Sequence, residues 1–167
     1  AGVSSVSLHV KDAPVFVSDV TGSDVAGIVD WVDSQAPDFG KRLRGWLEDG
    51  QLRVVPSSFY TTARFFWQLP DDLNSEYQKA AAVILKGDAN YRRLLADLHW
   101  PYDTSFEDYA SGFWPSEGLI SLRTMKSGVA LGIPEDKQAE ARAARPDDWL
   151  TCGIYGQILA SRQASPA

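Results

Sequence analysis

The chain has 167 residues, enough for one domain, or a large part of one, with a core of useful size. Its composition, 44% hydrophobic and 23% charged, is typical of a globular protein. Sixteen basic and twenty-two acidic residues give a net charge of −6. This balance argues against a nucleic-acid partner, which would require a basic surface. It leaves a phosphorylated small molecule open as a ligand, because a local pair of cations suffices to bind one.

Cys152 is the only cysteine, so the chain can form neither an internal disulfide nor a thiolate metal cluster. No apolar run reaches the roughly 18 residues of a membrane span. The N-terminus has neither the basic start nor the apolar block of a signal peptide. We therefore expect a cytoplasmic protein that has no membrane partner.

The first third of the chain combines apolar runs with helical patterns. Apolar and polar residues alternate over 6–10, which predicts a strand with one wetter face. A second apolar run, 13–17, predicts another strand that ends near Asp19. Apolar residues then recur at helical spacing, which predicts helices over 23–35 and 37–49.

The middle of the chain predicts one buried strand. A short strand is expected over 51–55, then a strand and loop over the aromatic-rich residues 57–69, then a helix over 70–80. The apolar run 80–85 is bounded by Lys-Gly and predicts a strand that is buried on both faces.

The residues after that strand are the most informative of the chain. Apolar residues over 91–98 recur at i, i+3, i+4 and i+7, which predicts an amphipathic helix. Asp88 and Asn90 therefore lie where a strand gives way to a helix. In open α/β sheets, ligands bind outside the carboxyl ends of strands and beside helix N-termini.

The rest of the chain continues the alternation of strands and helices, which predicts an α/β fold. We expect one α/β domain over 1–160 and a flexible tail over 161–167. The remaining predicted elements are a loop at 99–104, a short helix at 105–113, a strand at 119–123, a charged helix at 135–145 and a strand at 153–160.

Three predicted strand ends carry polar groups. The first carries Asp19, the second Asp88 with Asn90, and the third Arg123 with Lys126. If the three strands are neighbours in one sheet, these groups meet at one edge. Carboxylates mixed with cations suit a divalent metal that holds a phosphate.

Most of these residues also have a structural alternative. Asp19 and Asp88 can cap the helices that follow them, and Tyr91 can pack within its apolar stripe. Arg123 can bind a phosphate bidentately, or it can hold a loop through a structural ion pair. Lys126 can be a surface lysine.

Short motifs add to this interpretation, and their order and spacing resemble those of the metal-dependent damage-control phosphatase family. Some members of that family have also been described as protein-glutamate methyltransferases. The resemblance extends from about residue 6 to residue 133. The motifs are Leu8-His9-Val10-Lys11, Phe16-Val17-Ser18-Asp19, Lys86-Gly87-Asp88-Ala89-Asn90-Tyr91-Arg92, Trp100-Pro101, Thr104-Ser105-Phe106 and Arg123-Thr124-Met125-Lys126.

The resemblance implies a three-layer sandwich around a mainly parallel sheet, a divalent metal (manganese, cobalt, nickel or magnesium), and hydrolysis of phosphate monoesters of sugars or related metabolites. Asp19 matches a metal ligand and Lys126 matches the lysine of the Arg-Thr-x-Lys signature. We therefore predict Asp19 and Lys126 to be catalytic, Asp19 also being the metal ligand. The predicted substrate-binding residues are Gly87, Asp88, Ala89, Asn90, Tyr91, Arg123 and Lys126.

The resemblance also implies that part of the metal site is missing. The family's other two ligands form an adjacent Asp-Asn pair, and this chain contains no such dipeptide. We expect the chain to correspond to the C-terminal portion of such an enzyme, with a sheet that is incomplete on its N-terminal side. The alternative is a non-catalytic or partner-dependent subunit, whose partner would be the N-terminal portion as a separate chain. Methyl transfer is less favoured, because no glycine-rich strand-to-helix turn is present to bind the methyl donor.

Overall fold

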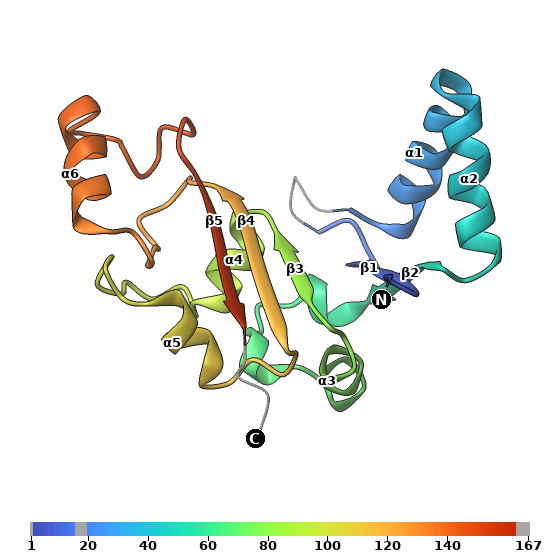
Figure 1. Ribbon diagram of the computed structural model, residues 1–167, viewed down its shortest axis with the longest axis horizontal. Coiled ribbons are helices and arrows are strands. Elements are labelled where there is room, and N and C mark those ends of the chain that lie inside the picture. Colours follow the sequence, from blue (N-terminus) through green and yellow to red (C-terminus); the bar gives the residue numbers. More distant parts are fainter. Residues whose placement is uncertain (1, 16–19, 163–167) are drawn as a thin grey trace. The chain divides into compact units, whose positions relative to one another are not determined.

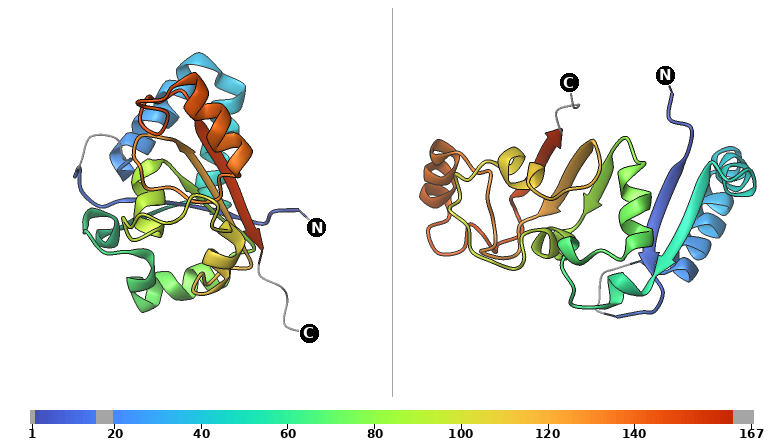
Figure 2. Two further views of the ribbon diagram at one scale, coloured as in Figure 1. Left: turned by 90° about the vertical axis from the view of Figure 1, so that its left-hand side faces the viewer. Right: turned by 90° about the horizontal axis from the view of Figure 1, so that it is seen from below.

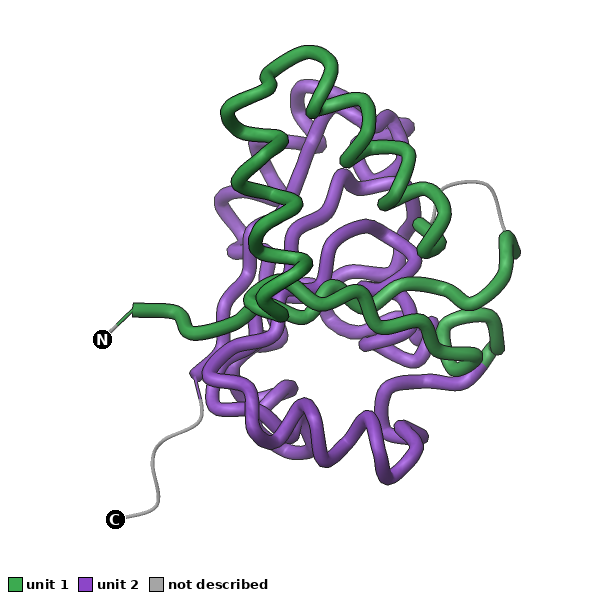
Figure 3. The backbone as a smooth tube through the Cα atoms, turned by 90° about the vertical axis from the view of Figure 1, so that its right-hand side faces the viewer, with its two compact units in different colours: residues 1–63 green, residues 64–167 purple. Residues whose placement is uncertain are grey.

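The computed structural model describes residues 2–15 and 20–162, and its elements are labelled in Figure 1. Contacts divide the chain into two compact units, Ala1–Ala63 and Arg64–Ala167 (Figure 3). Each unit combines helices with a small sheet, and most strand pairs are parallel. The predicted α/β class is confirmed. No helix in the described ranges is long and apolar enough to cross a membrane.

The first unit contains two parallel strands joined by a helical crossover. β1 (Val6–Lys11) pairs with β2 (Leu52–Ser57). Parallel neighbours cannot be joined by a tight turn, and here the connection contains α1 (Gly22–Gln35) and α2 (Pro37–Glu48). The two helices lie side by side and both contact β2 (Figure 2). Both helices are confirmed close to their predicted bounds.

The core of this unit forms where the apolar stripe of α1 meets β1. Val25 and Val29 are buried and cluster with Val10. The helix begins with a capping box, in which the Thr21 N–H donates to the Asp24 carboxylate at 2.8 Å. The spacing of the apolar residues and a local cap thus explain both the position and the orientation of α1.

The strand predicted over 13–17 is wrong for the residues that the structure describes. Residues 13–15 belong to no strand, and residues 16–19, including Asp19, lie outside the described residues. Pro14 cannot donate a hydrogen bond to a strand ladder. The Lys11 N–H instead donates to the Val20 carbonyl at 3.0 Å, so Val20 lies beside the end of β1.

The strand predicted within 57–69 is also wrong. The segment forms two 3₁₀ helices, η1 (Ser58–Thr61) and η2 (Phe66–Gln68). The Ser57 hydroxyl accepts a hydrogen bond from the Phe59 N–H at 3.3 Å, and the Gln68 side chain accepts one from Phe65 at 3.0 Å. Such local side-chain bonds to the backbone compete with strand pairing.

The second unit contains a three-stranded sheet. Its strands lie side by side in the order β3-β4-β5, with β3 parallel and β5 antiparallel to β4 (Figure 2). β5 includes residues 161–162 of the predicted tail, and residues 163–167 lie outside the described residues. The elements are α3 (Asp71–Gln78), β3 (Val83–Lys86), α4 (Asp88–Leu94), α5 (Phe106–Ser111), β4 (Gly118–Thr124), α6 (Glu135–Ala144) and β5 (Gly156–Arg162).

The expectation that β3 is buried on both faces is wrong. Leu85 is 5% exposed, whereas Ile84, on the opposite face, is 61% exposed. α4 contacts β3 and β4, and its apolar stripe is fully buried at Tyr91 and Leu94. The apolar composition of the run therefore predicted a strand correctly but could not tell how many of its faces are covered.

Gly87 joins β3 to α4 with φ of 100° and ψ of 158°. Glycine reaches this backbone conformation easily, whereas other residues do so at a cost of about 1–3 kcal/mol. We expect Gly87→Ala to lower the free energy of unfolding by about that amount, even though no heavy atom lies within 4 Å of the added Cβ. Chemical denaturation measures the change.

Gly45→Ala is the matched control. An added Cβ at Gly45 also meets no atom within 4 Å, but this glycine lies inside α2. Alanine there should raise the free energy of unfolding by about 0.5–1 kcal/mol. If both substitutions change stability by the same amount and in the same direction, the strain assigned to Gly87 is wrong.

Candidate functional site

The ends of β3 and β4 lie next to each other at one edge of the sheet. The strands are parallel, with Lys86 opposite Leu122. Just beyond β3, the Gly87 N–H donates to the Leu122 carbonyl at 2.8 Å. Segment 87–91 follows β3 and segment 123–126 includes the last two residues of β4, so the two segments are neighbours, as the sequence predicted for neighbouring strands.

An ion pair joins the two segments. The Arg123 Nη1 group donates to Asp88 Oδ1 at 3.0 Å and to the Val129 carbonyl at 2.8 Å. The Arg123 side chain is 0% exposed and that of Asp88 is 14% exposed. Burial lowers the pKa of Arg123, while Tyr91 and Asp88 act to raise it. Such a buried charge needs a counter-charge and hydrogen bonds; Asp88 and the Val129 carbonyl supply them to Nη1, while Nη2 is buried without a hydrogen-bond partner among the described residues.

The Tyr91 ring packs against the arginine of this ion pair. The Arg123 guanidinium lies over the ring, 3.8 Å from its centroid, which is within the range of a cation–π contact. The Tyr91 hydroxyl accepts from the Leu131 N–H at 3.1 Å, and burial raises the pKa of Tyr91. Because Tyr91 is fully buried, the geometry favours the packing alternative over direct contact with a substrate.

The other residues of the predicted substrate loop are more accessible. Ala89 is exposed, while Asp88 and Asn90 are partly buried. The Asn90 side-chain amide donates to the Lys86 carbonyl at 3.0 Å, which fixes the first turn of α4 on the end of β3. Gly87 allows the sharp change of direction before this turn.

Buried and exposed residues alternate at the end of β4, and Lys126 is one of the exposed ones. Arg123 and Met125 are buried, whereas Thr124 and Lys126 are exposed. The Met125 N–H donates to the Tyr155 carbonyl at 2.9 Å, so the backbone just before Lys126 is held in place. The ammonium group is thus accessible at the carboxyl end of β4.

The predicted metal ligand, Asp19, lies outside the described residues. Among the residues that are described, no three His, Cys, Asp or Glu side chains lie close enough together to hold a metal ion. The described residues therefore do not fit a metal site by themselves.

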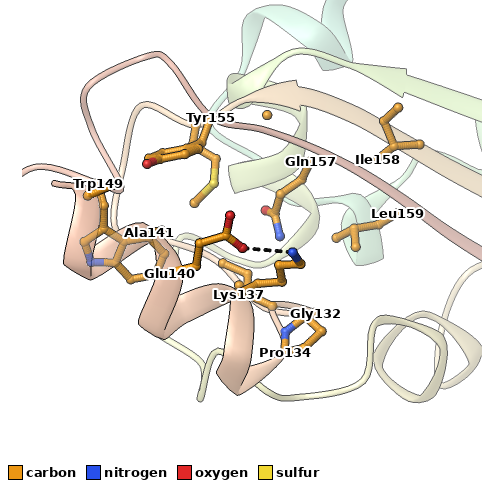
Figure 4. A pocket seen from close by; sticks show the side chains of 14 residues that line it. Gly132, Pro134, Lys137, Glu140, Ala141, Trp149, Tyr155, Gln157, Ile158 and Leu159 are labelled. Carbon is orange, nitrogen blue, oxygen red and sulfur yellow. Dashed lines mark hydrogen bonds and ion pairs between the residues drawn. The ribbon is translucent and has the colours of Figure 1, made fainter.

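A cavity of about 410 Å³, which the sequence analysis missed, lies between α6 and β5 (Figure 4). Its lining includes Met125, Trp149 and Gln157, and Lys137 pairs with Glu140 across 2.9 Å beside it. No motif connects these residues, because they come from segments that are far apart in the sequence. The residue that links this cavity to the site is Gln157, which lines the cavity and lies directly opposite Arg123 where β5 pairs with β4.

The site thus brings a buried arginine, a carboxylate and an accessible lysine to one edge of a mixed three-stranded sheet. This arrangement and its motifs agree with a known phosphatase family. A family model described as the damage-control phosphatase ARMT1-like domain matches residues 2–142. The chain belongs to this damage-control phosphatase family.

Known relatives support this membership. The chain is 34% identical over 160 residues to the protein named damage-control phosphatase ARMT1 of Mus musculus, covering 92% of this chain and 36% of the relative. It is 31% identical over 169 residues to that of Xenopus laevis (95% and 37%) and 29% identical over 160 residues to that of Homo sapiens (92% and 36%). The chain therefore spans little more than a third of the length of these relatives.

Removing the buried Arg123 guanidinium should destabilise the folded protein. Arg123→Met leaves the largely buried Asp88 carboxylate without this partner, and losing one member of a buried ion pair costs roughly 3–5 kcal/mol. We expect Arg123→Met to lower the free energy of unfolding by about that amount in chemical denaturation.

Arg92→Met is the matched control, since Arg92 also pairs with an aspartate, Asp97, at 2.6 Å, but both side chains are 45% exposed. This exposed pair should contribute about 1 kcal/mol or less. Equal losses for the two arginine variants would show that the Arg123 pair has no special structural role.

Proposed function

We propose that the protein is a metal-dependent phosphatase that hydrolyses phosphate monoesters of sugars or related metabolites. Membership of the damage-control phosphatase family supports phosphatase chemistry. The observation that carries the proposal is the ion pair between Asp88 and Arg123, at 3.0 Å. It joins the segment that matches the family's substrate loop to the segment that ends in Lys126.

Lys126 is the residue proposed to act on the phosphoryl group. Its side chain is exposed at the end of β4, where an ammonium group can reach phosphate oxygens. Hydrolysis spreads negative charge over the transferring phosphoryl oxygens, and a fixed cation stabilises that charge. Since Arg123 is buried and already paired, Lys126 is the better candidate of the two for direct contact.

Asp88 and Asn90 are proposed to orient the rest of the substrate. Asp88 uses Oδ1 to bind Arg123, and its Oδ2 atom would accept a hydrogen bond from a sugar hydroxyl. Asn90 uses its amide nitrogen to bind the Lys86 carbonyl, and its amide oxygen would accept another. The backbone at Gly87 and Ala89 would complete this surface. Arg123 and Tyr91 would act indirectly, by holding Asp88 in place.

The metal remains part of the proposal. Manganese, cobalt, nickel or magnesium would suit carboxylate ligation, and such an ion would neutralise phosphate charge when bound. Asp19 is proposed as one ligand because its motif matches the family's. The described residues contain no group of three ligands, so the others would come from elsewhere in the protein. A chain that is active only with a partner polypeptide fits the same observation.

Phosphate release from a hexose phosphate, measured with manganese on the protein at its full natural length, tests this function. A chelator should abolish turnover and added manganese should restore it. Lys126→Met should lower kcat/KM by about 10²- to 10³-fold, the cost of losing one group that stabilises transition-state charge. Lys79→Met is the matched control, because Lys79 is also exposed but follows α3; its activity should stay close to that of the wild type.

Wild-type turnover by Lys126→Met would refute the role of this lysine. Near-normal turnover by Asp19→Ala would refute metal ligation by Asp19. The same assay on the 167-residue chain alone separates the two forms of the proposal, because turnover without any further polypeptide would exclude dependence on a partner.

A further inference from the structure

Gln157 lies in β5 directly opposite Arg123 of β4. Opposite residues of an antiparallel pair are close enough for their side chains to interact. Gln157 Oε1 accepts a hydrogen bond from the Arg123 Nε–H at 3.0 Å, and Gln157 Nε2 donates to the Leu131 carbonyl at 3.0 Å. One side-chain amide therefore connects the buried guanidinium to the loop between β4 and α6.

Together with two contacts of Tyr91, these hydrogen bonds form a closed ring of four residues. Arg123 lies over the Tyr91 ring, the Tyr91 hydroxyl binds the Leu131 backbone, Leu131 binds Gln157, and Gln157 binds Arg123. We call these four residues, together with Asp88, the Arg123 cluster. Its members come from α4, β4, β5 and the loop after β4, so each contact limits the freedom of the others.

The amide of Gln157 matches both of its neighbours. The Arg123 Nε–H requires an acceptor and the Leu131 carbonyl requires a donor, and a primary amide offers both on one planar group. A carboxylate at position 157 would keep the acceptor but turn an oxygen toward the Leu131 carbonyl. A hydrocarbon side chain would leave both neighbours without this partner, which is costly for buried polar groups.

β5 also supports Lys126 through its backbone. The Tyr155 carbonyl, two residues before Gln157, accepts from the Met125 N–H at 2.9 Å. The strand residue that starts the Arg-Thr-x-Lys motif is thus held by the Gln157 side chain, and the residue before Lys126 is held by the backbone leading into β5.

We propose that Gln157 is a positioning residue of the phosphatase site, which fixes Asp88 and the segment ending in Lys126 by holding the Arg123 guanidinium. This inference rests on the proposed function. Gln157 acts through Arg123. It lines the cavity beside α6 (Figure 4), so a side chain of similar size can replace it without overpacking the core.

Steady-state kinetics of the full-length protein on a hexose phosphate, with manganese, tests the proposal. Misplacing a catalytic group by about 1 Å can cost as much as 10²-fold, so Gln157→Leu should lower kcat/KM by roughly 10- to 100-fold, with a raised KM. A merely structural loss would reduce the amount of folded enzyme, which lowers the apparent kcat but leaves KM unchanged. Gln157→Glu keeps the acceptor for Arg123 and should recover part of the loss.

Gln138→Leu is the matched control. Gln138 also donates to a carbonyl of this loop, that of Ile133, at 2.8 Å, but it does not bind Arg123. Its kcat and KM should stay close to those of the wild type. An unchanged KM for Gln157→Leu, or an equal change for Gln138→Leu, would overturn the proposal.

Exchange of the Arg123 Nε–H with solvent, followed by NMR, gives a second readout that needs no activity. Gln157→Leu should speed this exchange at least about tenfold if it frees the guanidinium, and Gln138→Leu should not. If the wild-type protein shows no metal-dependent phosphatase activity, the proposed function fails, but faster exchange in Gln157→Leu still supports the conclusion that Gln157 restrains the Arg123 guanidinium. Unchanged exchange in Gln157→Leu overturns that conclusion.

Discussion

The buried ion pair between Arg123 and Asp88 is the interaction on which the rest of the site depends. Asp88 follows β3 and Arg123 lies near the end of the neighbouring parallel strand β4, and the Arg123 side chain is completely removed from solvent. A charge in that position needs partners for its donors; Nε and Nη1 are paired, whereas Nη2 is buried without a hydrogen-bond partner among the described residues. Val129, Gln157 and Tyr91 all contact the same guanidinium. The contacts that stabilise one buried guanidinium thus fix α4, the ends of two strands and a loop relative to one another.

This constraint explains how the end of β4 can present an accessible lysine on a backbone that is held in place. Alternation along β4 and the residues after it buries Arg123 and Met125 and exposes Lys126. The inward residues anchor the segment, and the outward lysine remains accessible. A phosphatase needs such fixed charges, because preorganised electrostatics contribute most when little rearrangement is required. Family membership supports phosphatase chemistry, and the exposed position of Lys126 is compatible with the role proposed for it.

Local patterns predicted most of the elements. The apolar stripes of α1 and α4 and the proline at the start of α2 are short-range signals. α1 and α2 begin within one residue of their expected starts, whereas α4 begins at Asp88, before the stripe of 91–98, and ends at Leu94. The failures also have local causes. Pro14 and the side-chain bonds within 57–69 favour non-strand backbone, and apolar composition alone could not reveal that Ile84 is exposed. The predicted metal ligand Asp19 lies outside the described residues, so its role stays a prediction.

The sequence by itself determined the order of helices and strands and the chemical groups at the strand ends, because periodicity, capping and motif spacing depend on residues close in the chain. It could not determine the partners of Arg123. Asp88 and Gln157 lie 35 and 34 residues away in the sequence, and only the pairing of β4 with β3 on one side and β5 on the other brings them together. Hydrogen bonds between strands and the burial of one guanidinium decided that arrangement.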